Sequence, residues 1–362
     1  MVPIRIALDA MGGDQGPAPL VAGAVAALAA EPDLWLQLVG EPETLRAALQ
    51  ACRAEAGERL QLVPAGGAIP MGDHPAEAVR HRPDASVVVA VQRVAHQEAD
   101  ACYSAGHSGA TMAAALFHLH RLPGVARPAI GTTIPRPGGG AALLLDAGAQ
   151  VDCRPEWLAQ FAVLGSAYSE RVLGVPQPRV GLLSIGEEPG KGGQLVRDAD
   201  RLLRQTPVHY LGPVEGRDLV SGRCDVLVTD GFTGNVALKV AEGVAEQMLR
   251  TLREAAHQGW RARAGGWLLR PALGSLRAET DWRRTGGVPL LGVRGLVYIG
   301  HGRSDALAVR HGIRLAAAAA RAGTAALLAE AIRGWAATVP AADPPAPAAA
   351  AARLSQESAS WT

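Results

Sequence analysis

The sequence predicts an α/β protein in which a mostly parallel sheet is flanked by helices. Short runs rich in Leu, Val and Ile alternate along the chain with Ala- and Leu-rich amphipathic stretches, the pattern of repeated strand–helix units. Glycine clusters follow many of the expected strands, and open sheets of this kind bind ligands beyond the carboxyl ends of their strands. We therefore expect the glycine-rich turns to meet along one edge of the sheet.

The elements follow from the period and length of each apolar run. The first run, residues 3–9, has the length of a buried strand, and Pro17 favours a helix that begins there. Strands are expected near residues 3–9, 34–39, 59–63, 99–104, 129–133, 141–146, 179–185, 208–211, 224–229 and 295–299. Helices are expected over residues 17–30, 42–56, 85–97, 109–121, 155–172, 193–204, 235–256 and 305–335.

We expect one domain over residues 1–337, with a helical hairpin inserted at about 240–284. The Pro- and Ala-rich tail, residues 338–362, lacks large apolar groups, so we expect it to be disordered. The net charge is +1, which leaves any basic surface local, and we expect no nucleic-acid partner. The chain opens without a signal-peptide pattern and has no apolar run of about 20 residues, so a cytoplasmic protein is expected.

The four cysteines are widely spaced and form no CxxC pair, and no histidine pair has metal-ligand spacing. We expect reduced thiols and no metal site. Basic residues are more informative, because 33 of the 35 are arginine and only Lys191 and Lys239 are lysine. The chain also has a single asparagine, Asn235. Arginine cannot replace the compact point charge of lysine in a tight site, so the two lysines are candidate site residues. Asn235 is a third candidate because it is the single asparagine of the chain.

The first glycine-rich turn follows the first strand and contains Asp9, Gly12, Gly13 and Asp14. The glycines permit a close approach of backbone to a ligand, so the turn is a candidate substrate pocket. It does not fit GxGxxG, and Asp14 could instead cap the next helix.

A second turn, with Gly106, His107, Ser108 and Gly109, also lies between a strand and a helix. Free N–H groups at a helix start, together with hydroxyls, form an anion cradle, so these residues are candidate phosphate ligands. The alternative is an ordinary serine-capped turn. Lys191 lies in another loop, residues 184–193, which lacks the spacing of a nucleotide phosphate loop.

The stretch from Asp230 to Lys239 contains most of the candidate catalytic side chains. Asn235 and Lys239 are four residues apart, so they share one face of the helix expected to begin near Asn235. An amide, an ammonium and a positive helix end suit a phosphate nucleophile or the oxyanion of a thioester under attack. His301, between glycines in a later loop, is either an acid–base group or a locally bonded loop histidine.

The segment 256–284 departs from the strand–helix rhythm and combines tryptophan with arginine. Residues 265–273 resemble the apolar tip of a helical hairpin. Such a surface suits dimer packing, an acidic carrier protein or anionic lipid headgroups. Its candidate contact residues are Arg261, Arg263, Trp267, Leu268, Leu269 and Arg270.

Taken together, the motifs resemble those of the phosphate acyltransferases of bacterial lipid synthesis, the PlsX family, over roughly residues 4–335. The motifs that carry the resemblance are DAMGGDQGP, SAGHSGATM, LLLDAGAQVD, SIGEEPGKG, YLGPVEGRDL, VTDGFTGNVALK, GGVPLLGVRG and GHGRSDA. The chain departs from the usual pattern at His107 (usually Asn), Ser108 (usually Thr), Thr285 (usually Tyr) and Ile299 (usually Lys).

The resemblance implies a three-layer α/β/α sandwich related to phosphate acetyltransferases and isocitrate-type dehydrogenases, and a homodimer without organic cofactor. It implies transfer of a fatty acyl group from acyl carrier protein to inorganic phosphate. The acyl phosphate would serve a membrane glycerol-3-phosphate acyltransferase, so peripheral attachment to the inner face of the membrane remains open.

Within this reading, Gly106, His107, Ser108 and Gly109 would cradle phosphate, with Lys191 closing over it. Asn235 and Lys239 would stabilise the oxyanion, Asp230 would orient one of them, and His301 would protonate the leaving thiolate. The competing hypotheses are a dehydrogenase of related fold and a non-catalytic adaptor for a carrier protein or membrane.

Overall fold

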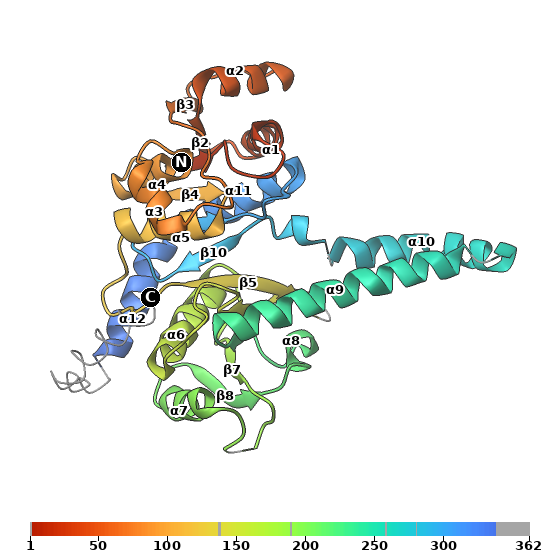
Figure 1. Cartoon of the computed structure of the whole chain (residues 1–362). Helices are drawn as coiled ribbons and strands as arrows, with labels where there is room; N and C mark the ends of the chain where they lie inside the picture. Colours follow the sequence, from red (N-terminus) through yellow and green to blue (C-terminus); the bar gives the residue numbers. More distant parts are fainter. Residues whose placement is uncertain (1, 137–138, 189, 258, 280, 338–362) are drawn as a thin grey trace, which may run out of the picture.

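The computed structural model describes residues 2–136, 139–188, 190–257, 259–279 and 281–337. These residues form a single 11-stranded sheet with helices on both faces (Figure 1), which confirms the predicted α/β class. The predicted disorder of 338–362 falls outside the described residues. The strands are β1 (Ile4–Asp9), β2 (Leu34–Gly40), β3 (Leu60–Pro64), β4 (Ala101–Ser104), β5 (Ala129–Pro135), β6 (Ala141–Leu145), β7 (Arg179–Leu183), β8 (His209–Val214), β9 (Val226–Val228), β10 (Val288–Leu291) and β11 (Val297–Ile299).

The helices agree with the predicted ones in most places. They are α1 (Pro17–Ala30), α2 (Pro42–Ala51), α3 (Pro75–His81), α4 (Ser86–Ala95), α5 (Ser108–His118), α6 (Pro155–Arg171), α7 (Gln194–Leu203), α8 (Asp218–Ser221), α9 (Gly231–Ala256), α10 (Gly259–Glu279), α11 (Ala306–Arg321) and α12 (Thr324–Ala336). The single helix expected over 305–335 is two helices, because Gly323 has φ +64° and ends the run of helical backbone.

Alternating side chains of each strand divide the core into two layers. In β1, Ile4, Ile6 and Leu8 pack into the cluster that also contains residues of α1, α2, α6, α7, α11 and α12. Ala7 faces the other way, into a cluster with α3, α4 and α5. On that same face, the other half of the sheet is covered by α8 and α9. The result is a helix–sheet–helix sandwich, in which the period of two along each strand supplies both cores.

The strand order is β3-β2-β1-β4-β11-β10-β5-β6-β9-β7-β8, and it contains a reversal. Strands β1 to β4 run parallel with β11, whereas β6 runs parallel with β7, β8 and β9. Because β10 and β5 are antiparallel to their neighbours, these two groups run in opposite directions. The carboxyl ends of the two groups therefore point in opposite directions, yet residues that follow β1, β4, β6, β9 and β11 line one cleft. The expected meeting of the glycine-rich turns holds for these strands, whereas the loop 184–193 does not take part in it.

Helix α9 projects from the sheet. It begins just after β9, packs Ala237 and Leu238 against the core on the α8 side, and continues beyond the sheet with α10 beside it (Figure 1). Helix α9 ends at Ala256 and α10 begins at Gly259, so the segment 265–273 lies within α10 and is not the hairpin tip that the sequence suggested. Trp267, Leu268 and Leu269 lie within α10, where all three are exposed.

In the described part of the chain no single helix has the length and apolar character that crossing a membrane takes. Helices α11 and α12 reach that length and composition only as a pair, and they are bent by 59° at their junction.

Candidate functional site

A cleft of about 660 Å³ lies between α9, strand β5 and the loops that follow β1, β4 and β11. It brings together predicted site residues that come from widely separated parts of the chain. These are Asp14, Gly106, Ser108, Asn235, Lys239 and His301. The cleft is within the volume range typical of sites for small ligands.

Helix α9 carries Asn235 and Lys239 into this cleft. The helix begins at Gly231 rather than near Asn235, so the free N–H groups of its first turn belong to residues before Asn235. Gly231 and Gly234 allow the first turn to pack directly on the backbone after β6, at Asp146 and Gln150. The close packing fixes where the helix starts and therefore where its polar side chains lie.

Asp230 does not line the cleft. Its carboxylate accepts hydrogen bonds from the backbone N–H of Thr233 at 2.8 Å and from the Thr233 hydroxyl at 2.7 Å. The predicted role of orienting Asn235 or Lys239 directly is therefore wrong. Asp230 is the N-cap of α9 and acts on those residues only by fixing the helix start.

The turn after β4 presents Gly106 and Ser108 to the cleft at the start of α5. His107 and Gly109, also predicted as phosphate ligands, point elsewhere: Gly109 lies against Pro75, and His107 caps the helix. The Nδ1 of His107 accepts from the Ala110 N–H at 3.4 Å, and its Nε2 lies 3.3 Å from the carbonyl oxygen of Asp73. With a proton on Nε2, the ring satisfies both contacts.

Asp9 lies beneath the cleft instead of in it. Its buried carboxylate accepts from the Ser104 hydroxyl at 2.7 Å and from the N–H groups of Met11 and Gly12. Ser104 in turn accepts from the Gly106 N–H at 3.2 Å. Burial raises the pKa of Asp9, and the hydrogen bonds oppose this shift. Asp9 therefore joins the turns after β1 and β4, which corrects its assignment to the substrate pocket.

Gly12 and Gly13 serve the same loop packing. A Cβ at Gly12 would lie 2.8 Å from the Gly106 nitrogen, and Gly13 has φ +92°. The next residue, Asp14, donates its N–H to the Gly302 carbonyl at 2.7 Å and does line the cleft. Of the four residues predicted in this turn, only Asp14 faces the cleft, and the other three hold neighbouring loops at close distance.

His301 lines the cleft opposite the first turns of α9. Burial lowers its pKa below 6.5, and the positive charges of Arg303 and Lys239 lower it further, against the carboxylates of Glu242 and Asp14. The Nδ1 of His301 accepts from the Arg303 N–H at 3.3 Å, which leaves Nε2 to carry the proton in the neutral ring. The lowered pKa favours the neutral ring, so the predicted role as acid requires His301 to gain a proton during the reaction.

Lys239 is half exposed, and its Nζ lies 2.9 Å from Oε2 of Glu242. An exposed ion pair of this kind contributes at most about 1 kcal/mol. An anion entering the cleft can therefore compete with Glu242 for the ammonium group.

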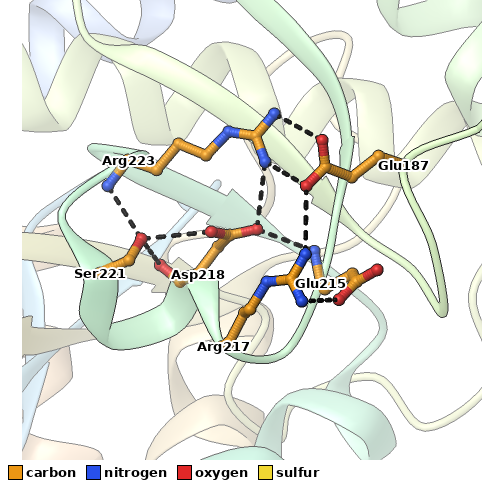
Figure 2. A network of polar contacts seen from close by, with 6 residues as sticks. All are labelled: Glu187, Glu215, Arg217, Asp218, Ser221 and Arg223. Atoms are coloured by element: carbon orange, nitrogen blue, oxygen red, sulfur yellow. Dashed lines mark hydrogen bonds and ion pairs between the residues drawn. The ribbon is translucent and has the colours of Figure 1, made fainter.

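Lys191 does not line the cleft. Its loop is tied to the region around α8, as Figure 2 shows: Glu187 binds Arg223 through both carboxylate oxygens, one of them at 2.9 Å. Arg217 lies 3.7 Å from the same carboxylate. This contact network holds the loop against α8, so the predicted closure of Lys191 over a phosphate is not seen.

The apolar part of the cleft was not predicted from the sequence. Strand β5 contributes Ile130, Thr132, Thr133, Ile134 and Pro135, and α9 contributes Leu238, Ala241 and Ala245. The spacing of the three α9 residues was a usable signal, because positions i, i+3 and i+7 share a helix face. The β5 residues gave no such signal, since their position depends on the antiparallel pairing of β5 with β6 and β10.

Asp146 was also missed as an organising residue. At the end of β6 its buried carboxylate accepts from the backbone N–H groups of Ile130, Gly148, Ala149 and Gln150, at 2.6 to 3.1 Å. Burial raises its pKa, and these hydrogen bonds lower it. The turn built on Asp146 supports the start of α9 and places Gly148 against Asn235.

Among the described residues, no group of three or more His, Cys, Asp and Glu side chains is placed to hold a metal ion. The four cysteines are free thiols. Burial raises the pKa of Cys153 to about 12, so this thiol is protonated at neutral pH. The chemistry available in the cleft is therefore that of amides, hydroxyls, the ammonium of Lys239, the imidazole of His301, the carboxylates of Asp14, Glu242 and Asp281, and an apolar wall.

Comparisons with known proteins agree with this geometry. A family model described as "Fatty acid synthesis protein" matches residues 4–327. The chain is 49% identical over 317 residues to a phosphate acyltransferase of Nostoc punctiforme, covering 86% of this chain and 92% of the relative. It is 48% identical over 319 residues to a phosphate acyltransferase of Thermosynechococcus vestitus, covering 87% and 92%.

Solved structures share the fold at lower sequence identity. A phosphotransacetylase from Streptococcus pyogenes superposes with a TM-score of 0.60 at 17% identity, covering 88% of this chain and 94% of the other. A 4-hydroxythreonine-4-phosphate dehydrogenase from Klebsiella pneumoniae gives a TM-score of 0.51 at 12% identity, covering 87% and 98%. These likenesses concern the fold, and they confirm the predicted relation to transacetylases and dehydrogenases.

Proposed function

This chain belongs to the phosphate acyltransferase family, and on that premise we propose that it transfers a fatty acyl group from acyl carrier protein to inorganic phosphate. The observation that carries the proposal is the composition of one cleft. Its polar part holds Ser108, Asn235, Lys239 and His301, and an apolar wall of β5 and α9 continues from it. A small anion fits the first part, and a hydrocarbon chain fits the second.

Phosphate would bind where α5 begins. The Gly106–Ser108 turn offers N–H groups, a hydroxyl and the positive end of the helix, and Lys239 supplies a full positive charge opposite them. Phosphate would displace Glu242 from the ammonium group. Positioning is the largest contribution expected, because well-aligned reactants can gain about 7–11 kcal/mol over free ones.

The reaction would proceed by direct attack. A phosphate oxygen forms a bond to the thioester carbonyl carbon, the carbonyl oxygen becomes an oxyanion, and the C–S bond then breaks. Asn235 would donate its side-chain N–H to that oxyanion, with Lys239 nearby. Such a donor is worth roughly 3–4 kcal/mol when it is positioned before the reaction begins.

Hydrogen phosphate carries one proton that must reach the leaving thiolate. His301 would take this proton on Nδ1, in place of the contact with the Arg303 N–H, or on Nε2 after a change of tautomer. The resulting imidazolium would then protonate the sulfur. The products are acyl phosphate and the carrier thiol, with all protons accounted for. The downstream user would be a membrane glycerol-3-phosphate acyltransferase.

The long helices α9 and α10 would provide the macromolecular contacts. An exposed apolar stripe follows α9 at intervals of four residues, which suits pairing with a second copy of the chain. The stripe consists of Phe232, Val236, Val240, Val244, Met248 and Leu252. On α10, exposed Trp267, Leu268 and Leu269 lie among arginines, which suits an acidic carrier protein or anionic lipid headgroups at the inner face of the membrane.

The test is incubation of purified protein with acyl-acyl carrier protein and phosphate. The proposal predicts equal amounts of free carrier thiol and hydroxylamine-reactive acyl phosphate, neither of which forms when phosphate is omitted. A dehydrogenase would instead change the absorbance of a nicotinamide cofactor, and a non-catalytic adaptor would bind the carrier without turnover. Thiol release without acyl phosphate would show that water, not phosphate, accepts the acyl group.

A further inference from the structure

Helix α8 lies at the apolar part of the cleft and presents one side chain to it. Val220 lines the cleft and is 51% exposed, whereas its neighbour Leu219 is buried in the cluster that contains Ile134 and Leu144. Two consecutive residues thus have different tasks. Leu219 fixes the short helix to the sheet, and Val220 lines the cleft.

Polar contacts hold the backbone of α8 in place (Figure 2). Asp218 is buried, accepts from the Glu215 N–H at 3.1 Å and lies 3.5 Å from Arg223. Ser221 donates to Asp218 at 3.2 Å. Arg223 also binds Glu187, which belongs to the loop after β7. Contacts to two separate segments make α8 a fixed wall and not a movable lid.

The cleft extends from the loops after β4 and β11 to α8. Ser108 and His301 come from the β4 and β11 side of β5, whereas α8 packs on β5 from the β8 and β9 side. An acyl chain whose carbonyl lies near Asn235 would therefore run along β5 and under Leu238 toward Val220. The wall that it meets last is α8.

We propose that Val220 and the tethered helix α8 set the length of acyl chain that this enzyme accepts. The inference rests on the proposed acyl-acyl carrier protein substrate. Each methylene of the acyl chain that fits into the cleft is removed from water, which raises kcat/KM about fourfold. A methylene that Val220 keeps out of the cleft does not contribute this increase. A larger side chain at position 220 shortens the preferred chain, and a smaller one lengthens it.

The experiment measures kcat/KM for acyl phosphate formation with carrier thioesters of increasing even chain length. Val220→Trp is expected to move the optimum to shorter chains and to lower the rate with the original best donor by roughly tenfold or more relative to a donor two carbons shorter. Val220→Ala is expected to move the optimum the other way. Val2→Trp is the matched control, because Val2 is exposed and does not line the cleft.

A uniform loss of rate at every chain length, or an unchanged profile in both Val220 variants, would overturn the inference while leaving the proposed function intact. Failure of the wild-type protein to form acyl phosphate from any donor would instead overturn the proposed function. Because Val220 is half exposed, its replacement does not open a buried cavity, and Val220→Ala gives a second reading where tryptophan prevents folding.

Discussion

Adding a single methyl group at Gly234 should show whether the close packing at the start of α9 positions the catalytic groups. Gly234 lies in the first turn of α9, where a Cβ would be 1.9 Å from the carbonyl oxygen of Asp146. Real Cβ contacts are not found below 3.0 Å, so in the Gly234→Ala variant the start of α9 must move by about 1 Å. The obstacle is backbone at the end of β6, which cannot rotate away as a flexible side chain could.

The displacement would move Asn235 and Lys239 relative to Ser108 and His301. A misplacement of about 1 Å can lower kcat/KM by about 100-fold, so we expect a loss of that order in acyl phosphate formation. Overpacking costs about 1–3 kcal/mol, against a gain of up to about 1 kcal/mol for alanine over glycine in a helix. Urea denaturation should therefore show a modest net loss of stability.

The control is Gly243→Ala on the same helix, where no atom lies within 4 Å of the added Cβ. This variant should keep wild-type kinetics and gain roughly 0.5–1 kcal/mol in the free energy of unfolding. If Gly234→Ala also kept wild-type kinetics, the contact with Asp146 would not position the site, and the argument for α9 as the carrier of the catalytic groups would be wrong.

Three further results are expected. Burial alone raises the pKa of Asp225, but hydrogen bonds and charges from two arginines hold it below 3.8. The ionised carboxylate therefore stabilises the folded protein above pH 3.8, and this contribution is lost as the pH falls through the lowered pKa. Asp225→Asn should thus cost about 3 kcal/mol at pH 7 and less in acid, measured by urea denaturation at several pH values. His301→Ala should lower kcat and remove an acidic limb of the pH–kcat/KM profile whose midpoint lies below 6.5, and a retained limb would assign it to another group. Leu268→Glu with Leu269→Glu should weaken binding to acyl carrier protein or to anionic vesicles without changing the free energy of unfolding, and unaltered binding to both would exclude this surface.

The sequence was sufficient for the fold class because each strand and helix carries its own pattern. Runs such as residues 34–39 have the length and composition of buried strands, and glycine at 323 marks a helix break that the continuous apolar pattern concealed. Strand β10 was missed, since residues 286–295 are rich in glycine and resemble a loop. It is a strand because β11 and β5 pair with it from both sides.

The candidate site was predictable at the level of motifs and only partly at the level of residues. Asn235 and Lys239 were found because helical spacing places them together and because lysine and asparagine are scarce in this chain. Asp9 and Asp230 were misassigned, since a carboxylate that caps a helix or ties two loops looks the same in sequence as one that contacts a ligand. Val220 could not be found, because only tertiary packing brings α8 to the cleft.

The location of bound phosphate tests the central claim most directly. In a crystal structure of the protein soaked in phosphate, we expect the ion at the start of α5, within about 3 Å of the Ser108 N–H and of the Lys239 ammonium. The same soak of Lys239→Ala should give a weaker ion or none. Phosphate bound beside Lys191 instead, with the cleft holding only solvent, would contradict the account.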